Sequence, residues 1–66
     1  MADFDAETIK MKEGQNLMDV LRDALEEKGL ADRMDSDRGI FIIDDVTVLS
    51  IKDNEVECKV EYEYGG

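Results

Sequence analysis

The stretch VTVLSIKDNEVECKVEYEY, residues 46–64, decides the fold of this 66-residue chain. Two segments in which apolar and polar side chains alternate lie on either side of the pair Asp53-Asn54. Alternation with a period of two is typical of half-buried β-strands, and Asp and Asn tolerate the positive φ angles of a two-residue turn. The stretch therefore predicts an antiparallel hairpin with Asp53-Asn54 at its tip.

The register of this hairpin follows from its turn. If Lys52 pairs with Glu55, further pairs follow at every second residue, in the order Ile51–Val56, Leu49–Cys58, Thr47–Val60 and Asp45–Tyr62. One face is then an apolar core face, formed by Ile51, Leu49, Val56, Cys58, Val60 and Tyr62. The other face is half polar, with Ser50, Glu57, Lys59, Glu61 and Glu63 beside Val46 and Val48. A bulge at Asp44-Asp45 is expected, because it removes Asp45 from the core face.

A helix is predicted from Leu17 to Lys28, where apolar residues recur at the spacing of one helix face. Asn16 precedes it as a suitable N-cap. Gly29 can take the positive φ that ends a helix in a Schellman motif, with Leu30 as the apolar contact. The outer face of this helix carries carboxylates, namely Asp19, Asp23, Glu26 and Glu27.

The segment before the helix predicts one short strand over residues 7–12, because Ile9 and Met11 alternate with polar side chains. Phe4 and Ala6 have the opposite parity. We therefore expect either a bulge between the two parts or residues 1–5 frayed outside the sheet.

The order of predicted elements defines the fold class. The apolar run at residues 40–43 is either the first leg of the hairpin or a separate strand, since both faces of so apolar a segment are expected to be covered. We predict an α+β fold: a small β-α-β-β module with a three- or four-stranded, mostly antiparallel sheet and one helix packed on one face. Residues 1–66 are expected to form a single domain with residues 65–66 as a flexible tail.

Composition narrows the function. The chain has 18 acidic residues, 8 basic residues and a net charge of −10, which argues against binding nucleic-acid phosphates or anionic membranes. It has no histidine, and Cys58, its single cysteine, alternates in step with core residues as an inert thiol does. We therefore expect no enzyme activity and no cofactor. A lone thiol and an acidic N-terminus without a signal-peptide pattern predict a cytoplasmic protein.

The acidic loop does not match the EF-hand, the calcium-binding motif whose ligands are mostly carboxylates. An EF-hand that starts at Asp35 would have Gly39 at position 5 and Val46 at position 12, where the motif needs an oxygen ligand and a glutamate. We predict no metal site and interpret residues 32–37 as a solvated loop; whether this loop binds a cation weakly is left open.

Two stretches resemble one known family. EGQNLMDVLRDALEEKGL (residues 13–30) and IKDNEVECKVEYEYGG (residues 51–66) are similar to the helix entry and the last turn, last strand and Gly-Gly terminus of β-grasp proteins, which include ubiquitin-like and sulfur-carrier proteins. The resemblance implies a carrier function through Gly65 and Gly66, in which the terminal carboxylate is adenylated and then becomes a thiocarboxylate or an isopeptide.

The leading hypothesis is a non-enzymatic protein-interaction module, either a regulator or a viral or bacterial inhibitor, that presents carboxylates to a basic, nucleic-acid-binding partner protein. The residues expected to bind this partner are Asp19, Asp23, Glu26, Glu27, Glu57, Glu61 and Glu63. So small a core also predicts a homodimer or higher oligomer. The alternatives are the β-grasp carrier and a structural subunit of a homo-oligomeric assembly.

Overall fold

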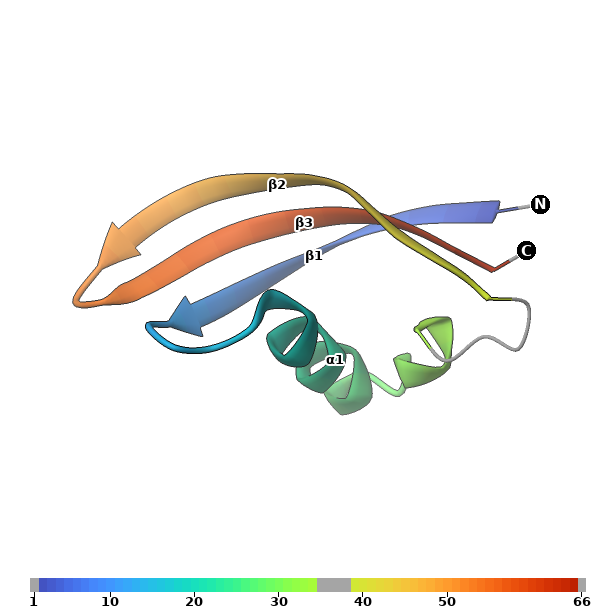
Figure 1. The fold of residues 1–66 in the computed structure, drawn as a ribbon, viewed down its shortest axis with the longest axis horizontal. Helices are drawn as coiled ribbons and strands as arrows, with labels where there is room; N and C mark the ends of the chain where they lie inside the picture. Colours follow the sequence, from blue (N-terminus) through green and yellow to red (C-terminus); the bar gives the residue numbers. More distant parts are fainter. Residues whose placement is uncertain (1, 35–38, 66) are drawn as a thin grey trace.

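The computed structural model describes residues 2–34 and 39–65 (Figure 1). Its elements are, in order, strand β1 (Ala2–Lys12), helix α1 (Leu17–Glu27), the 3₁₀ turn η1 (Ala31–Arg33), strand β2 (Ile40–Lys52) and strand β3 (Glu55–Gly65). Both β1 and β2 pair antiparallel with β3, which gives the sheet order β1-β3-β2. The predicted α+β class is confirmed, and residues 40–43 begin β2, the first leg of the hairpin.

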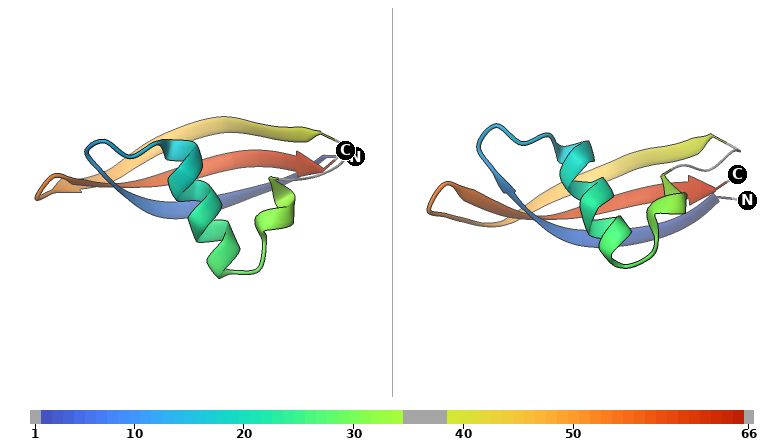
Figure 2. Two further views of the ribbon diagram at one scale, coloured as in Figure 1. Left: turned by 60° about the horizontal axis from the view of Figure 1, so that its bottom comes forward. Right: turned by 90° about the horizontal axis from the view of Figure 1, so that it is seen from below.

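Helix α1 lies across one face of the sheet, and the other face carries no helix (Figure 2). Asn16 caps its N-terminus, because its side-chain oxygen accepts the Met18 backbone N–H at 2.8 Å. Gly29 follows the helix at φ 74°, and the Leu30 N–H donates to the Leu25 carbonyl at 2.7 Å. This is the predicted Schellman ending, and it turns the chain back toward the sheet.

The hairpin turn is also as predicted. Asp53 and Asn54 have φ angles of 50° and 64°, the left-handed conformations of a two-residue turn between twisted strands. The pairs nearest the turn, Lys52–Glu55 and Ile51–Val56, have the expected register.

Beyond the next pair, Ser50–Glu57, the predicted register is wrong. The β2–β3 ladder shifts between Val48 and Ser50, so Leu49 is a bulge residue that the sequence pattern did not reveal. The expected bulge near Asp44 is present, as a second shift between Ile43 and Asp45. The observed pairs are Val48–Cys58, Val46–Val60, Asp45–Glu61 and Ile43–Tyr62. The extra bulge turns Val46 and Val48, rather than Thr47 and Leu49, to the helix side of the sheet, where they remain 41% and 55% exposed.

The N-terminal segment differs from its prediction as well. Residues 2–5, expected to fray, belong to β1 and pair with β3 in an unbroken ladder that starts at Ala2–Gly65. No bulge separates Phe4 from Ile9. Phe4 and Ala6 therefore lie on the sheet face away from the helix, where Phe4 is 71% exposed.

The core lies between α1 and the β1–β3 half of the sheet, and its buried apolar residues are Ile9, Leu21, Leu25, Cys58, Val60 and Tyr62. The predicted burial of Cys58, Val60 and Tyr62 is thus confirmed, whereas Val56, also expected in the core, is only partly buried. Leu49 and Ile51, expected in the core, are instead 50% and 74% exposed. Burial raises the pKa of the Cys58 thiol, which keeps it protonated and unreactive at neutral pH.

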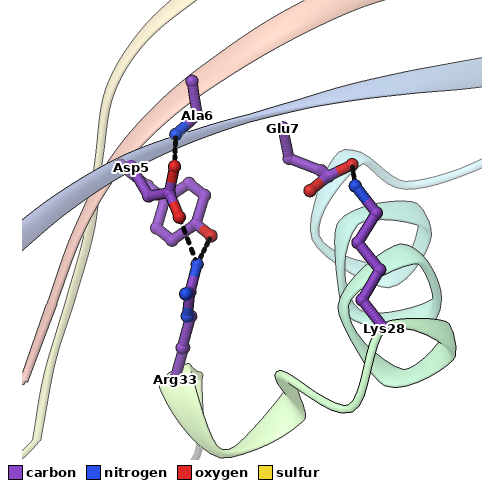
Figure 3. A network of polar contacts seen from close by, with 6 residues as sticks. Asp5, Ala6, Glu7, Lys28 and Arg33 are labelled. Carbon is purple, nitrogen blue, oxygen red and sulfur yellow. Dashed lines mark hydrogen bonds and ion pairs between the residues drawn. The ribbon is translucent and has the colours of Figure 1, made fainter.

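Two acidic residues on the helix side of β1, Glu7 and Asp5, have cationic partners (Figure 3). The Lys28 ammonium at the end of α1 pairs with Glu7, which is only 9% exposed. The Arg33 guanidinium from η1 donates to Asp5 and, at 2.8 Å, to the hydroxyl of the buried Tyr62. These contacts fasten the segment after α1 to the sheet and compensate the charges that lie beneath it.

Candidate protein-interaction site

The candidate site lies on the sheet face away from α1, which we call the open face. Side chains alternate along each strand, so the neighbours of the buried β3 residues point to this face. β3 supplies a central row of charged side chains here, namely Glu55, Glu57, Lys59, Glu61 and Glu63. Residues of β1 and β2 lie beside each member of the row, and these neighbours decide its local charge.

Near the hairpin turn the charges of this row are compensated. Glu55 lies opposite Lys12 on β1 and Lys52 on β2. Glu57 lies opposite Lys10. Opposite charges across neighbouring strands attract, so this half of the open face has no excess of negative charge.

Near the chain termini the arrangement is reversed. Glu61 lies opposite Asp45 on β2, which puts two carboxylates directly across from each other. Glu63 shares a hydrogen bond with Asp44, the bulge residue of the same strand β2. We call these four residues, together with the neighbouring Phe4 and Ile42, the acidic patch.

Phe4 and Ile42 give the acidic patch its apolar part. Each lies opposite Glu63, one on β1 and the other on β2. Phe4 is 71% exposed and Ile42 is 52% exposed, although both are large apolar side chains. Exposed aromatic and aliphatic residues within a charged surface are typical of the anchor residues of protein interfaces.

The surroundings of Glu63 in the acidic patch raise its pKa. Partial burial and the neighbouring Asp44 carboxylate both raise this pKa above its ordinary value, since each disfavours the charged form. Within residues 2–34 and 39–65, the cation in an ion pair with the patch is Lys59, at 3.9 Å from Glu61. Both of these side chains are about half exposed, so this contact compensates little of the charge.

The structure divides the seven residues predicted to bind a partner. Glu61 and Glu63 belong to the acidic patch, whereas the four helix residues are exposed on the opposite side of the molecule, on α1: Asp19, Asp23, Glu26 and Glu27. Glu57 lies apart from both groups along β3, although it lines a shallow depression together with Asp23 and Glu27. One small partner therefore cannot contact all seven.

Sequence reasoning missed four members of the patch, namely Phe4, Ile42, Asp44 and Asp45. Phe4 carried a signal, because its parity already separated it from the core residues of β1. Asp44 and Asp45 were recognised as a misfit in the strand, and the expected bulge is what brings Asp44 beside Glu63.

Other chemistries find little support in the described part of the chain. Among residues 2–34 and 39–65, no group of three His, Cys, Asp or Glu side chains is placed to hold a metal ion. Asp35 and Asp37 of the acidic loop lie outside the described residues. No helix of the described segments is long and apolar enough to cross a membrane.

The carrier hypothesis depends on the two terminal glycines. Gly65 is the last residue of β3 and pairs with both Ala2 and Ile40, so it belongs to the sheet and not to the flexible tail that we expected. Gly66 lies outside the described residues. The β-grasp fold has two strands before its helix, whereas β1 alone precedes α1 here.

Comparisons with protein-family models, with curated protein sequences and with solved structures gave no match.

Proposed function

We propose that this chain is a small, non-enzymatic interaction module that binds a basic protein through the acidic patch. One observation carries the proposal. On the helix side, Glu7 and Asp5 each pair with a cation, whereas on the open face Asp45 lies across from another carboxylate, Glu61. Like charges directly opposite each other destabilise a sheet, so a partner that supplies cations gains binding energy from relieving this repulsion.

The geometry of the patch indicates the kind of partner. Arginine suits it, because the planar guanidinium binds carboxylates in a bidentate way and its aliphatic stem packs against apolar side chains such as Phe4 and Ile42. A surface that displays several arginines is typical of proteins that bind nucleic acid. Occupation of such a surface makes the module a regulator or inhibitor of its partner. The proposal places the protein in the cytoplasm, where the thiol of Cys58 stays reduced.

A pair of charge reversals tests the proposal. Asp45→Lys changes the acidic patch, and Asp23→Lys makes the same change of net charge on the outer side of α1. The probe is a short fluorescein-labelled peptide rich in arginine and leucine, whose binding is followed by anisotropy at low and at high salt. Long-range attraction by the net charge of −10 changes equally in both variants.

We expect Asp45→Lys to weaken binding of the peptide by about tenfold or more, and Asp23→Lys to change it by less than about twofold. Amide shifts of wild-type residues around Phe4 and Ile42 should move on titration. Equal losses in the two variants would mean that net charge alone attracts the peptide. A loss in Asp23→Lys alone would assign binding to the helix, and either result overturns the proposal.

A further inference from the structure

The helix side of the sheet contains a second surface with different properties. Helix α1 has 11 residues, a length of about 16 Å at 1.5 Å per residue, while the longest dimension of the molecule is 39 Å. The hairpin half of the sheet extends beyond the helix (Figures 1 and 2). Val46, Val48 and Ile51 of β2 share the face of the core residues but are 41%, 55% and 74% exposed, because no helix covers them.

These exposed residues border an apolar groove. Its volume is about 500 Å³, and it runs between the hairpin and the loop that joins β1 to α1. Met11 and Leu17 line the loop side, and Val56 lies on β3 between the two sides. The charged residues of its lining are Lys12 and Glu13, whose charges cancel. The groove is therefore a neutral apolar surface on a strongly acidic chain.

The lack of net charge in the groove indicates which kind of molecule binds there. A basic partner gains nothing from a neutral groove, whereas a second copy of the chain has the same net charge of −10 and is repelled by the acidic surfaces. Two copies can approach where neither carries excess charge. The groove and the hairpin half of the open face meet this condition, whereas the outer side of α1 and the acidic patch do not. Of the two neutral surfaces, the groove is the apolar one.

Pairing of two β2 edges is a less suitable way to join the copies. β2 is an edge strand, but its ladder shifts near Asp44 and at Leu49. Bulges twist an edge away and interrupt the row of backbone groups that a second strand needs. The β2 edge, which borders the groove, is thus a poor template for strand pairing, whereas the apolar face beside it is available for association.

The shape of the groove suits two-fold symmetry. Ile51 is largely exposed at the hairpin and lies beside the hollow that Met11 and Leu17 border. In a two-fold dimer the same patch meets itself, so the hairpin of each copy can enter the hollow of the other. A weak but specific interface needs about 600 Å² from each partner, roughly an eighth of the 4609 Å² surface of this chain.

We propose that the groove is the interface of a reversible two-fold dimer, in which the hairpin of a second copy fills it. Because the interface is small, we expect a dissociation constant in the micromolar range, about 1–100 μM. High salt should strengthen the dimer, since it screens the repulsion between two chains that each carry −10.

The test compares two isoleucines of β2 that lie on opposite faces. Ile51→Ser removes an apolar side chain from the groove, and Ile42→Ser removes one from the open face as the matched control. The full chain and both variants are examined by sedimentation equilibrium over a wide concentration range at low and at high salt. Circular dichroism melting curves show that each variant is folded.

We expect the wild type to sediment as a monomer–dimer mixture, Ile51→Ser to weaken the dimer at least about tenfold, and Ile42→Ser to change it less than about twofold. A wild type that stays monomeric, species larger than a dimer, or equal effects of the two variants would overturn the proposal. Weakening by salt would also overturn it. The outcome is independent of the acidic patch, because the patch lies on the other face.

Discussion

Asp45→Lys should stabilise the protein while it weakens partner binding. The substitution removes the repulsion between Asp45 and Glu61 and replaces it with a pair of opposite charges across β2 and β3. Each of these two changes contributes about 0.2–1 kcal/mol for directly opposed residues. Both side chains are exposed to solvent, and the variant loses the hydrogen bond that the Asp45 carboxylate accepts from the Val46 N–H at 2.9 Å. We therefore expect the lower part of the summed range, a gain of about 0.5–1 kcal/mol at most.

The gain is measured as the free energy of unfolding in urea and as the melting temperature. A chain of this size melts about 4–8 °C higher for each kcal/mol, so the expected rise is about 2–8 °C. At about 1 M salt the Debye length falls to about 3 Å, and most of the gain should disappear. A gain that persists at high salt would come from something other than charge.

The control is Asp23→Lys on α1. The new lysine would lie four residues from both Asp19 and Glu27, and each such helix pair contributes about 0.2–0.5 kcal/mol. Both variants should therefore be stabilised to a similar extent, but only Asp45→Lys should lose affinity for the basic peptide. A stability difference between Asp45→Lys and the wild type that does not change with salt would refute the register that places Asp45 opposite Glu61, and with it the reasoning about the acidic patch.

Three further substitutions test other parts of the structure. Arg33→Ala should lower the free energy of unfolding in urea by about 2–4 kcal/mol. The substitution removes a charged hydrogen bond to the buried Tyr62 and a cation–π contact at 4.5 Å from the centre of the Tyr64 ring. A loss below about 1 kcal/mol would contradict the stabilising role of Arg33. Glu63→Gln tests the raised pKa of Glu63. Just above pH 4.5 the folded wild type still holds a proton that the unfolded chain has lost, so the stability of the wild type falls as the pH rises. The variant lacks this proton, and its urea midpoint should fall less from about pH 4 to about pH 7. Parallel curves for the two proteins would contradict the raised pKa of Glu63. Gly29→Ala should lower the free energy of unfolding, measured by thermal denaturation, by about 1–2 kcal/mol. The loss comes from the φ of 74°, which is unfavourable for alanine, and not from a steric clash, because a Cβ added at Gly29 has no neighbour within 4 Å.

Local signals in the sequence predicted those elements whose structure depends on neighbouring residues. The cap at Asn16, the Schellman ending at Gly29 and the turn at Asp53-Asn54 each require only a few adjacent residues with suitable side chains. The α1 boundaries and the hairpin were therefore predictable to within a residue or two. The same holds for the burial of β3, whose alternation is uninterrupted.

The register of β2 was not predictable by the same means. Extrapolation from the turn assumes one residue of β2 for each residue of β3, and the bulge at Leu49 breaks this rule. Its effect is non-local, since it turns Val46 and Val48 to the helix side, and the second shift near Asp44 then returns Ile43 to the same side. The parity of Val46 and Val48, opposite to that of Ile51, was the available signal for it.

The error in register also explains the limited prediction of the candidate site. The excess of acidic residues is visible in the sequence, but whether a carboxylate is compensated depends on the residue across the strand. Glu57 and Glu61 are equivalent in the alternating pattern, yet one lies opposite Lys10 and the other opposite Asp45. Such pairs follow only from the full register of three strands, with both bulges in place.

The two proposed surfaces lie on opposite faces of one sheet, and this arrangement has a consequence for binding. A dimer formed through the groove covers the helix side of each hairpin and leaves both acidic patches on its outer faces. The two patches then form a bivalent acidic ligand, and binding of the second patch to a partner with repeated basic sites becomes intramolecular. Dimer formation would thus strengthen binding to an extended basic surface without any new contact, while a short peptide would bind monomer and dimer equally. The small size of the chain is compatible with this division of roles, because the neutral face serves self-association and the charged face remains free for the partner.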